Sequence, residues 1–225
     1  MKKWLVSIFT FFFILSFSKK GFSQSESESK HNNIWDKIVL RIDDVPPLSS
    51  KLAETIRKLK IKKVIVSVIG AHLINSYKNS SMIEVLKEGI KEGWVVYNHS
   101  YWHKKGSFYR KYPHKLKEEI EMTQKLIKEI LGVEPKVFAC PGGKENLNRT
   151  LIKMITNEMG LKIDEGWDID TYDWHPQKSL TPSQIAEQIK QKLKKKEKVI
   201  ILIHGTKKRW DKDLEIIDSL LKTRS

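Results

Sequence analysis

The sequence predicts an α/β fold: a distorted, incomplete (β/α) barrel of parallel strands with helices on the outside. The first observation behind this prediction is that, from residue 36 onward, β-rich runs alternate with amphipathic stretches of helical length. Strands that alternate with helices form right-handed βαβ units and a parallel sheet. The second is that about six or seven such units follow one another. A doubly wound open sheet is the alternative, although no Gly-rich phosphate-binding loop follows any predicted strand.

The predicted elements follow in order along the chain. β-branched and other apolar residues predict strands over residues 37–42, 63–69, 94–97, 136–139, 161–163 and 199–203. Apolar residues at helical spacing predict helices over residues 49–60, 81–92, 114–131, 148–159, 182–195 and 211–221. Ser49 or Ser50 is expected to cap the first helix, and Gly132 to end the third. Pro182 is expected in the first turn of the fifth.

The N-terminal end differs in composition from the rest of the chain. A basic start, Lys2-Lys3, precedes an apolar stretch over residues 4–17 and then small and polar residues. This order is typical of a secretory signal, so residues 1–23 are predicted to be a signal peptide and the protein to be secreted or held in the cell envelope. An uncleaved N-terminal anchor is the alternative and would be the expected membrane contact. We predict a polar linker over residues 24–33 and one folded domain over residues 34–225.

The charge of the chain bears on its partners. The formal net charge is +15, and about +11 without residues 1–23, whose only charged side chains are lysines. Such a charge is typical of proteins that bind nucleic acid or anionic surfaces. Lysines, however, are spread along every predicted helix among glutamates, which favours a solvated exterior. We therefore expect no nucleic-acid partner and a monomer, while attraction to an anionic cell envelope stays open. The single cysteine, Cys140, excludes an internal disulfide.

Polar side chains follow the ends of several predicted strands. Asp43-Asp44 comes after the first strand, and His99 comes after the third. Pro141-Gly142 follows the fourth strand, and His204 follows the last. In parallel β/α folds the active site forms at the C-terminal ends of the strands. We therefore expect these residues, although far apart in the sequence, to converge on one rim.

A metal site is one interpretation of this rim. His99 and His103 have i, i+4 spacing, which places both imidazoles on one face if the segment is helical. Alone, such a pair is more often made of ordinary surface or core residues. A carboxylate from Asp43-Asp44 would complete a set that leaves open positions on a metal, as a catalytic site needs. Neighbouring residues leaving a strand point in different directions, so one carboxylate can ligate while the other acts as a base. A turn-forming aspartate pair before proline is the alternative.

Five short motifs at suitable spacing extend this interpretation. Over residues 36–206 the sequence resembles the NodB-homology polysaccharide deacetylases, carbohydrate esterase family 4. The segments that carry the resemblance are Arg41-Ile42-Asp43-Asp44-Val45, His99-Ser100-Tyr101-Trp102-His103, Ala139-Cys140-Pro141-Gly142-Gly143, Asp173-Trp174 and Leu202-Ile203-His204. The resemblance implies a fold of the NodB type and hydrolysis of N-acetyl groups on an N-acetylated glycan.

The resemblance also implies a role for each matched residue. Asp43 would be the general base, and His204 the general acid with Asp173 holding its ring. A divalent metal, Zn²⁺ first and Co²⁺ or Ni²⁺ as alternatives, would be bound by Asp44, His99 and His103. The remaining matched positions would contact the substrate: Pro141 and Gly142 at the oxyanion, through the backbone N–H of Gly142, and Trp174 as a wall of the pocket.

Two positions depart from the family's usual pattern. Ala139 stands where many members have an arginine that steadies the catalytic base, and Val45 replaces the glycine of the first motif. The form around Ala139 resembles the branch that contains poly-N-acetylglucosamine deacetylases. Peptidoglycan and chitin-like polymers stay open as substrates. A catalytically weak glycan-binding protein on the same fold is the second hypothesis, although the presence of Asp43 and His204 argues against it.

Overall fold

The computed structural model describes residues 33–77, 80–206 and 209–223. The predicted signal peptide, residues 1–23, and nearly all of the predicted linker lie outside the described residues. Within the described part of the chain, no helix is long and apolar enough to cross a membrane.

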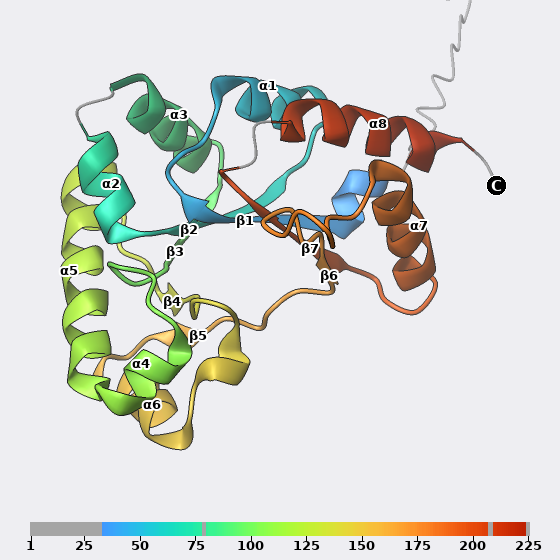
Figure 1. The fold of residues 1–225 in the computed structure, drawn as a ribbon. Coiled ribbons are helices and arrows are strands. Elements are labelled where there is room, and N and C mark those ends of the chain that lie inside the picture. The colour runs from blue at the N-terminus through green and yellow to red at the C-terminus, as the bar shows by residue number, and fades with distance from the viewer. Residues whose placement is uncertain (1–32, 78–79, 207–208, 224–225) are drawn as a thin grey trace, which may run out of the picture. The chain divides into compact units, whose positions relative to one another are not determined.

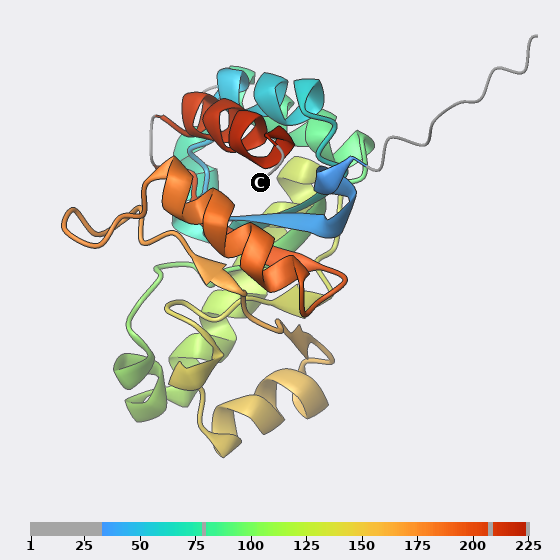
Figure 2. The same ribbon diagram turned by 90° about the vertical axis from the view of Figure 1, so that its right-hand side faces the viewer.

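Seven strands form one parallel sheet that curls into a half-barrel (Figures 1 and 2). The strands are β1 (Ile38–Val45), β2 (Lys63–Val68), β3 (Val95–Asn98), β4 (Val137–Phe138), β5 (Lys162–Ile163), β6 (Ile169–Asp170) and β7 (Val199–His204). Their order is β5-β4-β3-β2-β1-β7-β6. Because β5 and β6 follow each other in the chain yet form opposite edges, the barrel is open between them. The predicted incomplete (β/α) barrel is confirmed, in place of the doubly wound alternative.

Strand β1 occupies the middle of this sheet. It pairs in parallel with β2 on one side and with β7 on the other. Seven of its eight residues are buried, since helices cover its outer face and the curled sheet encloses much of its inner face. The polar residues at its carboxyl end are therefore held by the best-supported strand of the fold.

The helices pack outside the sheet (Figure 1). They are α1 (Ser50–Lys58), α2 (Gly70–Ser76), α3 (Ser80–Lys91), α4 (Gly106–Lys111), α5 (Pro113–Leu131), α6 (Arg149–Lys153), α7 (Pro182–Leu193) and α8 (Trp210–Lys222). Figures 1 and 2 both show α8 beside α1. The three expected helix signals are present. The Ser49 side chain accepts a hydrogen bond from the Leu52 amide, Pro182 begins α7, and Gly132 ends α5 with a φ of 74°.

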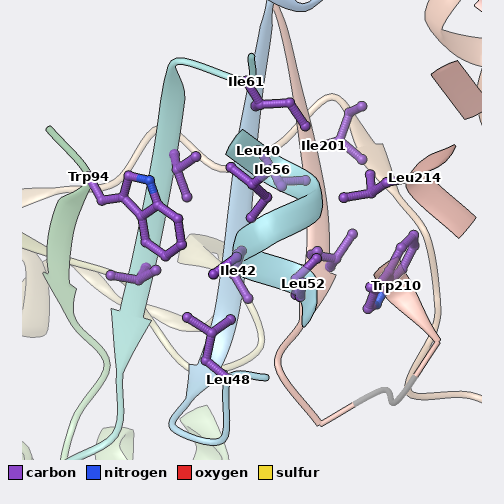
Figure 3. Close-up of a cluster of buried hydrophobic side chains, with 14 of the residues drawn as sticks. Leu40, Ile42, Leu48, Leu52, Ile56, Ile61, Trp94, Ile201, Trp210 and Leu214 are labelled. Carbon is purple, nitrogen blue, oxygen red and sulfur yellow. The ribbon is translucent and has the colours of Figure 1, made fainter. Parts of the chain in front are cut away.

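The main hydrophobic core lies between the sheet and the outer helices (Figure 3). Leu40 and Ile42 project from β1 toward Leu52 and Ile56 of α1, and all four side chains are at most 2 % exposed. A second, smaller cluster packs α4, α5 and α6 around Phe138 of β4. Apolar side chains thus hold the outer face of β1, so the opposite face of that strand is left for Arg41 and Asp43.

The short elements α2, α4 and β6 were not predicted from the sequence, nor were the 3-10 helices Ile34–Lys37 and Lys144–Asn146. Each has too few residues to show a clear period. The predicted helix over residues 148–159 begins as α6 and continues as a π-helix over Met154–Glu158. Trp94, predicted as the start of a strand, lies just before β3 and is buried in the main core.

Replacement of Ile56 by alanine tests the contact between α1 and the sheet. The Ile56 side chain is 1 % exposed, so its truncation leaves a cavity, and we expect a loss of about 2–5 kcal/mol in the free energy of unfolding. Ile216→Ala, at a 45 % exposed position on α8, is the matched control and should cost far less. Urea unfolding of both variants measures the difference, and equal losses would contradict the packing described.

Candidate active site

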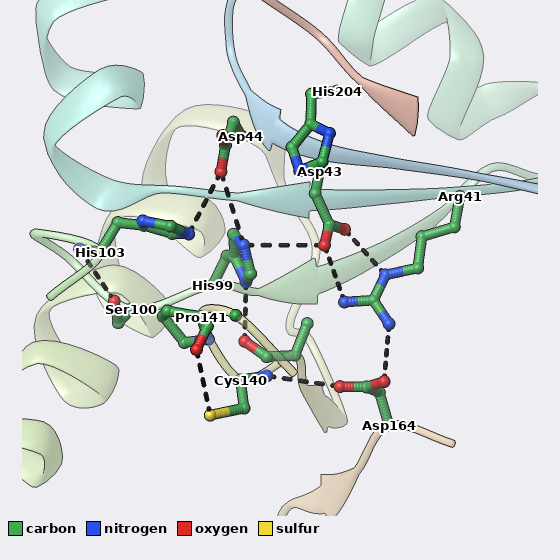
Figure 4. Close-up of polar contacts among 12 residues, drawn as sticks. Arg41, Asp43, Asp44, His99, Ser100, His103, Cys140, Pro141, Asp164 and His204 are labelled. Atoms are coloured by element: carbon green, nitrogen blue, oxygen red, sulfur yellow. Dashed lines mark hydrogen bonds and ion pairs between the residues drawn. The ribbon is translucent and has the colours of Figure 1, made fainter. Parts of the chain in front are cut away.

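Two consecutive aspartates at the end of β1 face the same rim because the strand is irregular there. In a regular strand, successive side chains point to opposite faces. Asp44 has a left-handed backbone with φ of 61°, and the pairing of β1 with β2 shifts register between Ile42 and Val45. This bulge turns Asp44 toward the histidines while Asp43 points into the concave side of the sheet (Figure 4). The two carboxylates therefore meet different partners, because Asp44 faces His99 and His103 whereas Asp43 is bound by Arg41.

The segment from His99 to His103 is a loop after β3, so the helical arrangement considered for this pair is wrong. Ser100 and His103 have φ values of 60° and 53°, which a helix excludes. Side-chain hydrogen bonds shape the loop instead. The Ser100 amide donates to Asn98 Oδ1 at 3.0 Å, and the His103 amide donates to Ser100 Oγ at 3.1 Å. The two imidazoles still converge, with ring centroids 4.8 Å apart.

Glu119 of α5 holds the His99–His103 loop in place through hydrogen bonds. One carboxylate oxygen, Oε2, accepts hydrogen bonds from the Trp102 amide at 2.9 Å, the Tyr101 amide at 3.2 Å and the Tyr109 hydroxyl at 2.7 Å. Glu119 is buried, and a buried carboxylate is stable only when it is well hydrogen-bonded. The loop that carries the histidines is therefore tied to the longest helix of the fold.

The side chains of Asp44, His99 and His103 form a group that fits a metal ion. Their ligand atoms all lie within 4.8 Å of one another. Asp44 Oδ1 lies 3.4 Å from His103 Nε2 and 3.6 Å from His99 Nε2, close to the roughly 3.3 Å that separates ligands around a tetrahedral zinc. This oxygen is buried and has no hydrogen-bond partner among the described residues. A cation between the three atoms would give it one.

The orientation of His99 also suits a metal ligand. Its Nδ1 lies 2.7 Å from the carbonyl oxygen of Ala139. A carbonyl only accepts, so Nδ1 carries a hydrogen, and Nε2 is the ring nitrogen that faces Asp44 (Figure 4). A hydrogen bond to the second ring nitrogen is the usual way in which proteins fix a metal-binding histidine.

The electrostatics of this group favour a positive charge. Burial raises the pKa of Asp44, but His99 and His103 outweigh it and lower that pKa to about 2. Burial lowers the pKa of His99, yet the facing carboxylates of Asp43 and Asp44 raise it overall. The Asp44 carboxylate is therefore ionised near neutral pH, which is the form that a metal requires.

Asp43 is held by Arg41 from the same strand. Arg41 Nε and Nη2 each donate to one oxygen of the Asp43 carboxylate at 2.8 Å. Arg41 Nη1 donates to Asp164, just after β5, at 2.6 Å. All three side chains are at most 5 % exposed. Arg41 thus forms a buried ion pair with two carboxylates (Figure 4).

His204 lies opposite Asp43 across the pairing of β1 with β7. Its Nδ1 is 2.6 Å from Oδ1 of Asp173. Oδ2 of Asp173 accepts from the His204 amide at 2.8 Å and from Trp210 Nε1 at 2.7 Å. These bonds fix the ring so that Nδ1 faces the fully buried Asp173 side chain and Nε2 is left for the rim.

Comparison with known proteins shows which family this chain belongs to. The sequence model of a family described as polysaccharide deacetylase matches residues 30–164. The chain belongs to the polysaccharide deacetylase family. Its fold is similar to that of the polysaccharide deacetylase Bc1974 from Bacillus cereus, with 28% identity and a TM-score of 0.62, over 82% of this chain and 86% of that one. It is also similar to the peptidoglycan deacetylase PdaC from Bacillus subtilis, with 25% identity and a TM-score of 0.62, over 82% of each chain.

One curated relative matches the chain over a shorter stretch. It is the uncharacterized protein YlxY from Bacillus subtilis (strain 168), which is 29% identical over 109 residues. The match covers 48% of this chain and 32% of the relative. The chain therefore spans about a third of the length of that relative.

Three residues are predicted to contact the substrate, and each lies in a segment that follows a strand: Pro141, Gly142 and Trp174. Pro141-Gly142 follows β4, and Gly142 has a left-handed backbone with φ of 72°. Trp174 follows Asp173 and is 57 % exposed, with the rings of Tyr172 and His175 as neighbours. Within the described residues, no hydrogen bond or ring contact joins Trp174 to the histidines of the metal group. Cys140 is buried, and burial raises the pKa of its thiol to about 12, which makes it unreactive.

Four residues of this site were not among those singled out from the sequence: Arg41, Glu119, Asp164 and Trp210. A charged residue inside an apolar strand or on the apolar face of a helix indicates a buried, paired charge, which would have found Arg41 and Glu119. Asp164 follows a predicted strand, so the rule of strand ends also covers it. Nothing in the sequence marks Trp210, whose partner is 37 positions away.

Glu119→Gln tests the anchoring of the histidine loop. The amide oxygen of glutamine is a weaker acceptor for the three donors, so we expect the affinity for Zn²⁺ to fall about tenfold or more. Competition with a chromophoric chelator measures it. The control is Glu121→Gln, two positions along the same helix and exposed, which should bind Zn²⁺ like the unaltered protein. Equal affinity in both variants would contradict the anchoring role.

Proposed function

We propose that this protein hydrolyses N-acetyl groups of an amino-sugar polysaccharide, with a divalent metal held by Asp44, His99 and His103. The observation that carries the proposal is the convergence of these ligand atoms within 4.8 Å beside a separately held carboxylate, Asp43, and a carboxylate-bound imidazole, His204. Membership of the polysaccharide deacetylase family supports it. Two similar structures are of a polysaccharide deacetylase and a peptidoglycan deacetylase.

Zn²⁺ suits the two imidazoles and one carboxylate best, and Co²⁺ or Ni²⁺ also fit such donors. A divalent ion bound there would act as a Lewis acid: it would polarise the acetyl carbonyl and lower the pKa of a water molecule. The ligand set leaves open positions, which a catalytic site needs and a structural site lacks.

Asp43 is the proposed general base. Burial raises its pKa, but His99 and Arg41 outweigh that effect and lower the pKa overall, so the carboxylate is ready to accept a proton from the attacking water. Its position between Arg41 and the metal group leaves it close to the ligands without being one of them. The backbone N–H of Gly142 is the proposed oxyanion donor, with Pro141 shaping that turn.

His204 is the proposed general acid for the departing amine. Burial lowers its pKa, but the hydrogen bond and charge of Asp173 outweigh burial and raise the pKa overall. A protonated imidazole therefore persists toward neutral pH, and Nε2 can donate its proton to the amine nitrogen. The products are acetate and a free amino sugar.

For the substrate, we propose a class of glycan and not a single polymer. The form of the segment around Ala139 favours poly-N-acetylglucosamine, and the similarity to PdaC favours peptidoglycan; a chitin-like polymer is the third option. All three lie outside the cytoplasm or in the cell envelope, in agreement with the predicted export signal over residues 1–23. Trp174, on the rim beside Asp173, is the proposed wall of the sugar site.

Acetate release tests the proposed function. We expect protein loaded with Zn²⁺ to release acetate from at least one of the three polymers. Removal of the metal by chelator or by His99→Ala should lower the rate by at least about 10³-fold, because the carbonyl loses its Lewis acid. His114→Ala, an exposed histidine on α5, is the control and should keep full activity. Undiminished activity in the chelator-treated protein would refute the metal-dependent mechanism.

The pH profile tests the pairing of His204 with Asp173. His204 must be protonated to act as an acid, so activity is lost as pH rises through its pKa, which Asp173 raises. Asp173→Asn removes the carboxylate, so the alkaline limb of kcat/KM should move to lower pH by about one unit or more and kcat should fall. An unmoved alkaline limb would show that another group is the acid.

A catalytically weak glycan-binding protein is the second candidate. The exposed indoles of Trp102 and Trp174, 59 % and 57 % accessible, are surfaces on which sugar rings stack. If the unaltered protein releases no acetate from any polymer while Asp43→Asn still binds one of them, this candidate replaces the enzyme.

A further inference from the structure

Arg41 is a buried cation on the concave side of the half-barrel. Its neighbours in β1, Leu40 and Ile42, belong to the hydrophobic core on the other face of the sheet. Arg41 instead shares a cavity lining with Ile65 of β2 and Tyr97 of β3. The side chain is 1 % exposed. Burying a guanidinium is costly unless it is fully paired, so this position calls for an explanation beyond packing.

The contacts of Arg41 span the concave side of the sheet. Two nitrogens hold both oxygens of Asp43, and the third reaches Asp164 (Figure 4). Asp164 is itself fixed by the Gly166 amide at 2.7 Å and the Cys140 amide at 3.3 Å. In the sheet, β2, β3 and β4 lie between β1 and β5. The guanidinium therefore connects the end of β1 to Asp164 after β5, and through Asp164 to the Cys140 amide after β4.

We propose that Arg41 is a positioning residue for the base of the reaction: it sets the plane of the Asp43 carboxylate and ties it to the far edge of the half-barrel through Asp164. This inference rests on the proposed function. A carboxylate held by one contact rotates about its last bond, whereas one held through both oxygens by a planar fork does not. The side chain of Ala139 has no donor, so the clamp on the base comes from β1 and not from the third motif.

The geometry requires arginine and not merely a positive charge. A lysine ammonium is a point donor and cannot meet two oxygens of one carboxylate and a second carboxylate in fixed directions. Arg41→Lys keeps the charge and most of the volume but removes the fork. Asp164→Asn keeps Arg41 and shortens no side chain, but it weakens the far anchor. The two variants therefore loosen the base from opposite ends.

Kinetics on the best polymer substrate provide the first test. We expect Arg41→Lys to lower kcat by about 10- to 100-fold with KM changed less than about twofold, because a misplaced base slows chemistry without weakening substrate binding. Asp164→Asn should also lower kcat with KM nearly unchanged, but its loss of kcat should be smaller. Affinity for Zn²⁺ should be unchanged in both. Arg57→Lys, on α1 and paired with Glu92 at the surface, is the matched control and should leave kcat unchanged.

Crystal structures of the metal-free unaltered protein and of the two variants provide the second test, which needs no activity. We expect one Asp43 carboxylate orientation in the unaltered protein and a rotated or divided one in Arg41→Lys. If the unaltered protein releases no acetate from any polymer, the proposed function fails and these structures still decide the clamp. Unchanged kcat in Arg41→Lys, or an unchanged Asp43 orientation in it, overturns the inference. If Arg41→Lys does not fold, Asp164→Asn decides by the same two criteria.

Discussion

The parallel pairing of β1 with a strand on each side is the constraint on which the rest of the structure depends. The register with β7 places Asp43 directly opposite His204, and parallel pairing brings the ends of β3, β4 and β5 to the same rim. On the outer face, Leu40 and Ile42 are locked into the core. A slip of one residue would exchange the faces of β1 and turn its carboxylates into the helix layer. The same register of β1 is therefore required both for core packing and for the geometry of the site.

Charge pairing inside the half-barrel gives the site its rigidity. Arg41 lies between Asp43 and Asp164, and Asp173 holds the ring of His204. Each of these groups is buried or nearly so, and a buried charge persists only with well-directed partners. Oδ1 of Asp44 is buried and has no hydrogen-bond partner among the described residues, and it faces the imidazoles of His103 and His99 at 3.4 and 3.6 Å. The same rule that explains the pairs therefore marks the place where a cation belongs.

Backbone strain concentrates at the same rim. Asp44, Ser100 and His103 have φ values of 61°, 60° and 53°, a region that residues with a side chain rarely adopt. Such residues persist where the surrounding structure holds them, and they cluster at functional sites. Here the supports are visible: Asn98 and Glu119 hold the histidine loop from β3 and α5. The geometry of the histidine loop is thus decided by β3 and α5, which carry none of the three ligands.

The sequence by itself determined the type and order of the longer elements, because periodicity and helix caps act over a few neighbouring residues. It also determined which side chains follow each strand, and so the candidates Asp44, His99 and His204. Only the tertiary structure decided that the His99–His103 segment is a loop, that a bulge at Asp44 aims both aspartates at one rim, and that Arg41 clamps Asp43. The reason is physical: Arg41 reaches Asp164 across 123 positions of sequence, and a local pattern carries no record of such a partner.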